Sequence, residues 1–319
     1  MTWYTKPSLS PGSPPKCCSS LGELVKCVIE LVSDHSLIPT ERGQAPIFAE
    51  PHRWWFRGAS RSHPLNAGLF RTRLAKVKYR SQPKTYGKLE QLLHHEYAQM
   101  TRGRFSDVSS NPWDRLFEMQ HYGLPTRLLD WSINLGHALW FALQSHKRTT
   151  KARHDPVIWI LNPRLLAKVS LGEAALNDFA YLELYGSDEE MRAWQPRVSH
   201  LPRQPSDRLG RILQYLSRHP SRGHFQILPS WTNPRLAAQM GCFTLQSGIE
   251  AIKSPPLDKF AWQSQSRGHV PFLYKICLRA SAAPEAADAL SCLGINAYSV
   301  FPELHETCSW IKDIRNVTR

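Results

Sequence analysis

Residues 113–132 read WDRLFEMQHYGLPTRLLDWS and are the most informative stretch of this chain. They combine polar side chains that form directed hydrogen bonds with aromatic rings, around Gly123 and Pro125. A packed core needs few such polar groups, and a solvated loop needs few such rings. The mixture is typical of a pocket wall, and a second aromatic stretch, WWFRG at residues 54–58, is predicted to line the same pocket.

Length and charge indicate the broad class of the protein. With 319 residues, the chain is long enough for one main domain with a smaller appendage. The formal net charge of +14 favours polyanionic partners, either nucleic acid or a phosphate-bearing small molecule. The sequence has no run of eighteen apolar residues and begins without the apolar segment of a secretory signal, so we expect a cytoplasmic protein without membrane contact. These properties leave the oligomeric state open.

Neither the cysteines nor the adjacent histidines form a metal-binding pattern. The seven cysteines include no CxxC pair, so we expect buried free thiols in a reducing compartment. His94, His95 and Glu96 are consecutive, and consecutive side chains on a helix point about 100° apart. We therefore expect no metal site, and no cysteine nucleophile because no cysteine lies within either polar motif.

The pattern of apolar residues predicts helices and strands of uneven length in alternation. The predicted strands are 54–58, 126–131, 157–161, 225–228, 243–245, 272–278 and 298–302. The predicted helices are 21–32, 88–99, 112–119, 135–142, 233–239, 282–293 and 304–314. This order favours an α+β fold with a mixed or antiparallel sheet and flanking helices, in a single main domain with a helical N-terminal extension.

Composition divides the chain into five segments. We expect a disordered Pro/Ser-rich tail, an N-terminal helix with a linker, a core, a basic helical insertion, and a C-terminal part of the same domain. Their respective bounds are 1–19, 20–49, 50–162, 163–224 and 225–319.

These residues resemble the FRG domain family, which takes its name from a Phe-Arg-Gly motif. Residues 56–58 are similar to that motif, and residues 120–131, QHYGLPTRLLDW, are similar to a highly specific second motif of the family. The resemblance covers residues 50–160 closely and residues 225–315 loosely. It implies a toxin-like effector in a bacterial or phage defence system.

A more distant resemblance is to ADP-ribosyltransferases of the arginine-serine-glutamate type, whose substrate is NAD. In that class an arginine holds the NAD diphosphate, a hydroxyl supports the nicotinamide ribose, and a glutamate stabilises the oxocarbenium-like transition state. The resemblance implies Arg57 for the diphosphate, Thr126 or Ser132 for the hydroxyl, and Glu250 or Glu303 for the carboxylate. The chain departs from the class in having no Ser-Thr-Ser triplet and no late Glu-x-Glu or Gln-x-Glu.

The arginines also point to phosphate on chemical grounds alone. Arg57 ends an aromatic strand, and Gly58 would let the chain pass close to a ligand while the guanidinium holds a phosphate. Arg71 and Arg127 are candidates for the same clamp, although Arg127 could instead brace its own turn. The alternative for Arg57 is a buried ion pair with Asp130 that organises the aromatic core.

His121 permits general acid–base chemistry. Asp130 could orient its imidazole. The resemblance to the ADP-ribosyltransferases further implies that Tyr122 or Trp131 stacks on a ring of the ligand. The alternative is a neutral His121 that bonds a backbone carbonyl in a packed turn.

We therefore expect an effector that acts on a nucleotide, most concretely an NAD-consuming ADP-ribosyltransferase or NAD glycohydrolase. One alternative is a non-catalytic module that recognises nucleic acid or a nucleotide signal; another is a nuclease that uses His121 and Asp130. The predicted catalytic residues are His121, Thr126, Asp130 and Glu303. The predicted ligand-binding residues are Arg57, Gly58, Arg71, Tyr122, Arg127 and Trp131.

Overall fold

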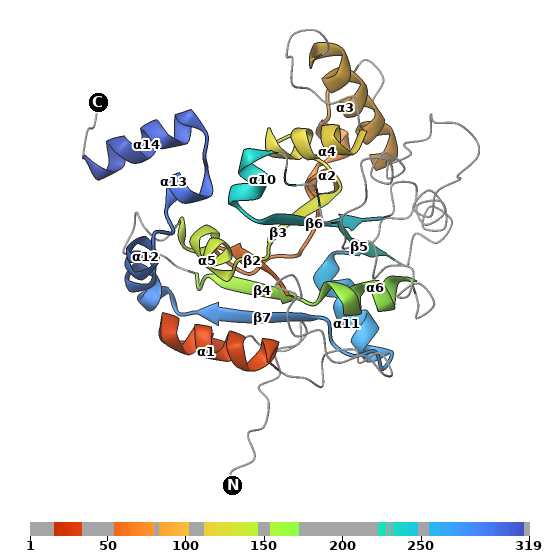
Figure 1. Cartoon of the computed structure of the whole chain (residues 1–319). Helices are drawn as coiled ribbons and strands as arrows, with labels where there is room; N and C mark the ends of the chain where they lie inside the picture. The colour runs from red at the N-terminus through yellow and green to blue at the C-terminus, as the bar shows by residue number, and fades with distance from the viewer. Residues whose placement is uncertain are drawn as a thin grey trace.

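A seven-stranded mixed sheet organises the computed structural model (Figure 1). The model describes residues 16–33, 54–79, 83–101, 112–145, 154–171, 223–227, 229, 231, 233–247 and 255–315. The strands are β1 (Lys16–Cys18), β2 (Trp55–Ala59), β3 (Leu128–Ser132), β4 (Val157–Leu161), β5 (His224–Ile227), β6 (Gly241–Gln246) and β7 (Leu273–Leu278). Their order across the sheet is β1-β7-β4-β2-β3-β6-β5. Only the β1–β7 pair among these strands is parallel, so the predicted α+β fold with a mixed sheet is confirmed.

Helices flank the sheet, and several begin where the sequence places a capping residue. The helices that position the core and the site are α1 (Leu21–Val32), α2 (Gly68–Arg71), α3 (Tyr86–Thr101), α4 (Pro112–His121), α5 (Leu135–Leu143), α6 (Pro163–Leu171), α10 (Pro234–Ala238), α11 (Leu257–Ser266), α12 (Ala283–Cys292), α13 (Ala297–Val300) and α14 (Leu304–Ile314). Ser20, Asn134 and Asn233 each accept backbone N–H bonds at a helix start, which satisfies donors that lack partners within the helix. Of the described helices, none is long and apolar enough to cross a membrane.

Three apolar clusters hold the helices to the sheet. On one face, α1, α5 and α12 pack against β2, β4 and β7. On the other face, α6 and α11 cover aromatic and aliphatic side chains of β2, β3 and β4. At the β5–β6 end, Leu116 of α4 packs on Leu128 and Phe243, and Figure 1 shows α2, α3 and α4 gathered at this end. The residue 120–132 stretch therefore crosses from a helix on the surface into the centre of the sheet.

Gly58 has a packing role. A Cβ at this position would lie 1.7 Å from the main-chain oxygen of Ala138 in α5 and 2.8 Å from the main-chain nitrogen of Ala142. The prediction that Gly58 gives close access to a ligand is therefore wrong, because the space beside its Cα is filled by the backbone of α5.

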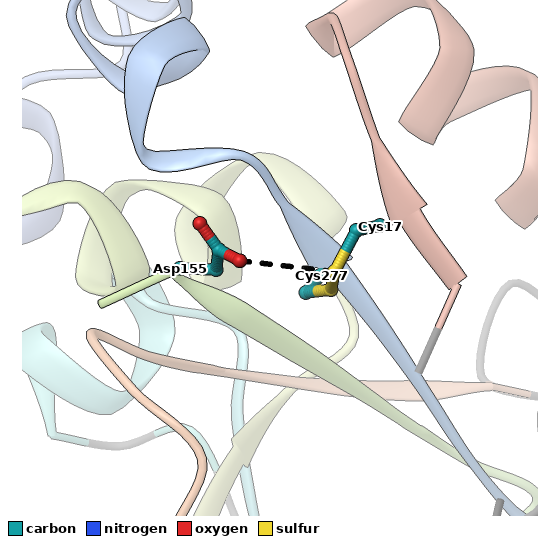
Figure 2. Close-up of side chains that lie close together, drawn as sticks. All are labelled: Cys17, Asp155 and Cys277. Atoms are coloured by element: carbon teal, nitrogen blue, oxygen red, sulfur yellow. Dashed lines mark hydrogen bonds between the residues drawn. A yellow bond between two sulfur atoms is a disulfide. The ribbon is translucent and has the colours of Figure 1, made fainter. Parts of the chain in front are cut away.

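The N-terminal segment departs from the prediction at residues 16–18. These residues were expected in the disordered tail, but they form β1, which pairs with β7. Cys17 lies opposite Cys277 in this pairing, and the two form a disulfide (Figure 2). The expectation of free thiols throughout is wrong for this pair, because residues far apart in the sequence become neighbours only in the sheet.

The predicted last strand, residues 298–302, is also wrong. Residues 297–300 form α13, and Phe301 follows it in an extended conformation. Asn296 and Ser299 form a reciprocal capping box, which stabilises a helix start despite the strand-like run of Tyr298 and Val300. Most of the predicted basic insertion, residues 172–222, lies outside the described residues.

Candidate functional site

Arg57 joins β2 to β3 where the two strands separate. The strands pair at Phe56 and Ser132, and the Arg57 guanidinium then donates from Nη1 to the main-chain oxygen of Asp130 at 2.6 Å. The same Nη1 lies 3.6 Å from a carboxylate oxygen of Asp130, whose side chain is 55% exposed. The structure thus contains the Arg57–Asp130 pair that the sequence offered as the alternative to a phosphate clamp. Arg57 Nε is buried and has no hydrogen-bond partner among the described residues, so the guanidinium retains donor capacity.

Gln120 links the two ends of the specific motif. Its amide nitrogen donates to both carboxylate oxygens of Asp130 at 3.0 Å, and its amide oxygen accepts from the Thr126 hydroxyl at 2.5 Å. The Thr126 oxygen in turn accepts from the main-chain nitrogen of Leu128 at 3.1 Å. Because Thr126 is fully buried and bonded in both directions, the structure argues against its predicted contact with a ribose.

Arg127 and Trp131 are also bonded within the protein. The Arg127 guanidinium makes a two-pronged ion pair with the buried carboxylate of Glu90 in α3, so Arg127 braces its turn and does not reach a phosphate clamp. The buried Trp131 indole donates to the Thr244 hydroxyl in β6 at 3.0 Å. Its ring lies in the apolar cluster under α6 and α11, which argues against stacking on a ligand.

Positive charge gathers around Arg57. Burial lowers the pKa of Arg57, the Asp130 carboxylate opposes that change, and the charge of Arg71 lowers the pKa further. Burial also lowers the pKa of His63, and the positive charges of Arg57, Arg71 and Arg61 lower it too. The basic side chains therefore repel one another across a short space, and an anion bound among them would relieve that repulsion.

A second group of charged residues forms around His121, at the end of α4. The Nε2 atom of His121 lies 3.4 Å from Oε1 of Glu303, and Nη1 of Arg235 in α10 lies 3.3 Å from the same oxygen. The second oxygen of Glu303, Oε2, is buried without a hydrogen-bond partner among the described residues. Burial and the charge of Arg235 lower the pKa of His121, while Glu303 opposes the change. The imidazole is therefore neutral at pH 7 and carries one nitrogen that can accept a proton.

The structure thus pairs His121 with a different carboxylate from the one predicted. Asp130 was expected to orient the imidazole, but it faces Gln120 and Arg57, and Glu303 takes its place. This separation weakens the nuclease hypothesis, which needs His121 and Asp130 together. Glu250, the other candidate carboxylate, lies outside the described residues.

Tyr122 is well placed for a stacking contact. Its side chain is 73% exposed, and its ring meets the His121 ring edge-on, with centroids 4.6 Å apart. His121 at the end of α4 therefore presents a mostly buried ring to Glu303, and Tyr122 adds an exposed ring next to His121.

The fold and these two polar groups define an α+β domain with a Phe-Arg-Gly strand at the centre of its sheet. Residues 52–151 match the model of the FRG domain, and the chain therefore contains an FRG domain. The match runs from β2 to α5 and includes Arg57, Gln120 and His121. Arg235 and Glu303 lie outside it. No curated protein and no solved structure matches the chain.

Sequence reasoning assigned no role to three residues of the site. Gln120 was recognised only as part of a motif, and it lies in the last turn of α4, directly before His121. His63 lies in the segment between β2 and α2 and had no motif of its own. Arg235 follows the helix cap Asn233, and nothing in the linear sequence indicates that α10 brings it to Glu303.

Proposed function

We propose that this chain is a nucleotide-directed effector enzyme that consumes NAD, as an ADP-ribosyltransferase or an NAD glycohydrolase. The observation that carries the proposal is the Glu303 carboxylate, which lies beside His121 with one buried oxygen unpartnered among the described residues. The Glu303 carboxylate is half-buried, and a carboxylate with a spare acceptor oxygen can stabilise positive charge that develops on a sugar. Adjacent residues link the two polar groups, because Gln120 contacts the Arg57–Asp130 pair and His121 contacts Glu303.

In this proposal, Arg57 and Arg71 bind the diphosphate of NAD, and His63 lines the same basic region. Exposed Arg71 supplies the accessible charge, while Arg57 is anchored to β3 and can add a directed donor. Tyr122 would stack on the nicotinamide or adenine ring. Four other predicted site residues, Gly58, Thr126, Arg127 and Trp131, maintain the shape of the domain.

The reaction breaks the bond between ribose C1′ and the nicotinamide nitrogen. Nicotinamide leaves with the bonding electrons, and positive charge develops on the ribose, where the Glu303 carboxylate stabilises it. Water or an acceptor group then forms the new bond to C1′, and neutral His121 takes its proton. This pairing places the proton acceptor and the stabilising carboxylate within 3.4 Å of each other.

The test is nicotinamide release from NAD by the purified full-length chain. Glu303→Gln should lower the rate about 10²-fold or more, as is usual when a charge-stabilising group is removed. Glu306→Gln, in the first turn of the helix α14 that follows Glu303, is the matched control and should retain activity. Arg71→Ala should raise KM for NAD, whereas Arg73→Ala should not. Intact NAD at stoichiometric wild-type enzyme, with protein and nucleic-acid acceptors present, would overturn the proposal.

Nucleic-acid recognition is the second candidate, and one observation favours it. Five basic side chains are exposed in the segment from β2 to Tyr79, in a chain with a net charge of +14. They are Arg61, Arg71, Arg73, Lys76 and Lys78. If all five contact phosphates of a DNA duplex, the logarithm of the affinity should fall with the logarithm of salt concentration with a slope of about −4 to −5. His121→Ala should leave this binding intact, while it should reduce nicotinamide release.

A further inference from the structure

Three neighbouring segments bring two sulfur atoms and a carboxylate to one spot on the sheet, remote in sequence from the motifs above. Cys17 of β1 lies directly opposite Cys277 of β7, and Cys277 lies opposite Val157 of β4. Asp155 precedes Val157 by two residues, so its side chain falls on the same face of the sheet. Figure 2 shows Cys17, Asp155 and Cys277 converging there.

The ligand atoms of these three residues already have the spacing of a small metal site. All of them lie within 4.8 Å of one another, and Cys17 Sγ is 3.8 Å from Asp155 Oδ2. Two ligands of a tetrahedral zinc ion, at about 2.0 to 2.3 Å from the metal, are about 3.3 to 3.8 Å apart. The carboxylate is therefore in place, and only the two sulfur atoms must separate.

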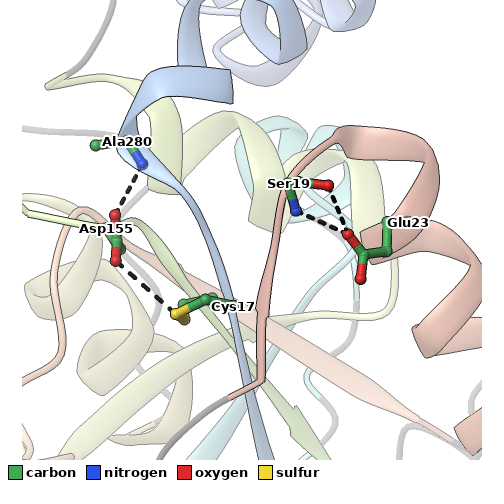
Figure 3. Close-up of a disulfide and its surroundings, with 6 residues drawn as sticks. Cys17, Ser19, Glu23, Asp155 and Ala280 are labelled. Atoms are coloured by element: carbon green, nitrogen blue, oxygen red, sulfur yellow. Dashed lines mark hydrogen bonds between the residues drawn. A yellow bond between two sulfur atoms is a disulfide. The ribbon is translucent and has the colours of Figure 1, made fainter.

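The surroundings hold Asp155 and Cys17 in position. Asp155 Oδ1 accepts from the main-chain nitrogen of Ala280 at 2.8 Å, which leaves Oδ2 directed at the sulfur (Figure 3). Behind Cys17, the nitrogen and hydroxyl of Ser19 both donate to Glu23 at 2.8 Å and tie β1 to α1. These bonds do not depend on the disulfide, so β1 should stay in place when the disulfide is reduced. Bonds of this kind to a ligating carboxylate commonly orient it for metal binding.

We propose that Cys17, Cys277 and Asp155 form a binding site for a thiophilic divalent ion such as Zn²⁺ in the reduced protein. Two thiolates and one carboxylate are a donor set that suits Zn²⁺, and the exposure of Cys17 allows water to fill the fourth position. A dithiol reductant converts the disulfide to two thiols and itself becomes a disulfide. The metal then replaces the two thiol protons, which are released to solvent. The disulfide and the metal complex are therefore mutually exclusive states of one site.

Because the disulfide and the metal complex exclude each other, the Cys17–Asp155 contact differs between the oxidised and the reduced protein. A disulfide sulfur carries no proton, so in the oxidised protein the carboxylate only lies beside it. Reduction gives Cys17 a thiol proton that Asp155 Oδ2 can accept, and the metal then takes the place of that proton. Asp155 thus has a partner in both reduced states.

The test uses the full-length chain, treated with a phosphine reductant that is then removed under anaerobic conditions. Titration with Zn²⁺ against a chromophoric chelator should show one tight site, and Co²⁺ should give a thiolate-to-cobalt charge-transfer band. The oxidised chain should give neither signal until it is reduced. Cys17→Ser should weaken binding at least about 100-fold and remove most of the band, and Asp155→Asn should weaken it about 10- to 100-fold.

Cys308→Ser is the matched control, because Cys308 is an exposed free thiol outside this site, and it should bind as the wild type does. Circular dichroism of each reduced variant shows whether the fold is retained, and Asp155→Asn keeps both sulfur atoms if Cys17→Ser does not fold. The proposal is wrong if the reduced wild type binds no Zn²⁺ tightly. It is also wrong if Asp155→Asn and Cys17→Ser both bind as tightly as the wild type.

Discussion

Replacing Glu90 and Arg127 together should destabilise the protein much less than the sum of the two single replacements. Arg127 lies in the turn before β3, and its guanidinium donates through Nε to Glu90 Oε1 at 2.7 Å and through Nη2 to the other carboxylate oxygen. The pair joins α3 to the specific motif. The side chains are only 4% and 15% exposed for Glu90 and Arg127, so each charge depends on the other in place of water.

The expected size follows from this burial. Removing one member of a buried ion pair costs about 3 to 5 kcal/mol, because the remaining charge has neither water nor a partner. We take about 3 kcal/mol for Glu90→Leu, since Arg127 retains some contact with water, and about 4 kcal/mol for Arg127→Met, which strands a buried carboxylate. Independent effects would sum to about 7 kcal/mol. The double variant should instead cost about 3 kcal/mol or less, because apolar side chains can replace such a pair at small cost.

Urea unfolding of the four proteins, followed by tryptophan fluorescence and by circular dichroism, measures the three changes in the free energy of unfolding. Nicotinamide release by the double variant separates the two roles suggested for Arg127. A brace predicts that activity recovers with stability, whereas a phosphate ligand predicts that it stays lost. Additive destabilisation in the double variant would contradict this prediction, because it would mean that the two side chains do not depend on each other.

Three further perturbations test the packing, a buried histidine and the cross-link. Gly58→Ala should lower the free energy of unfolding by about 3 kcal/mol, because its Cβ would overlap the backbone of α5. Gly22→Ala, which has open space in α1, should instead raise it slightly. Thermal melts of the two variants measure the difference. Burial lowers the pKa of His224 from 6.5 to about 4, so only the unfolded state takes a proton between these values. The free energy of unfolding should therefore fall by about 3 kcal/mol as the pH drops from 6.5 to 4. Urea midpoints measured across this range should fall less in His224→Gln than in the wild type. Reducing the Cys17–Cys277 disulfide, which spans 260 residues, should lower the free energy of unfolding by about 5 kcal/mol, seen as a lower urea midpoint in dithiothreitol; an unchanged midpoint would contradict the cross-link.

Much of the secondary structure could be predicted from local patterns. The helix at 304–314 and the strand at 157–161 have the predicted bounds, because their periodicity and apolar runs agree with their surroundings. Asn134 caps α5 by accepting from the main-chain nitrogens of Gly136 and His137, as asparagine commonly does before a helix. The prediction failed at 298–302, where a capping box of two short polar side chains outweighs the strand propensity of the run.

The candidate site was predictable in part. The sequence identified His121 and Glu303 as candidates, and the structure brings them to 3.4 Å. It could not indicate which carboxylate His121 would meet, because Asp130 is near in sequence while Glu303 arrives through α13. It also could not separate the arginines, since Arg57, Arg71 and Arg127 are equally suited to phosphate until burial and partners are known.

Most helices, most strands, the fold class and the FRG motifs could be predicted from the amino-acid sequence, because these depend on local periodicity, caps and residue order. The roles of the conspicuous polar residues, in contrast, became clear from their neighbours in the folded domain. Thr126 and Arg127 support the fold from within, and Gly58 contacts α5, because these residues are bonded or packed against other parts of the protein and are not available to a ligand. The same long-range pairing placed Cys17 on Cys277 and Arg235 on Glu303. The physical reason is that a side chain's chemistry is set by its solvent exposure and its neighbours, and both are properties of the folded sheet.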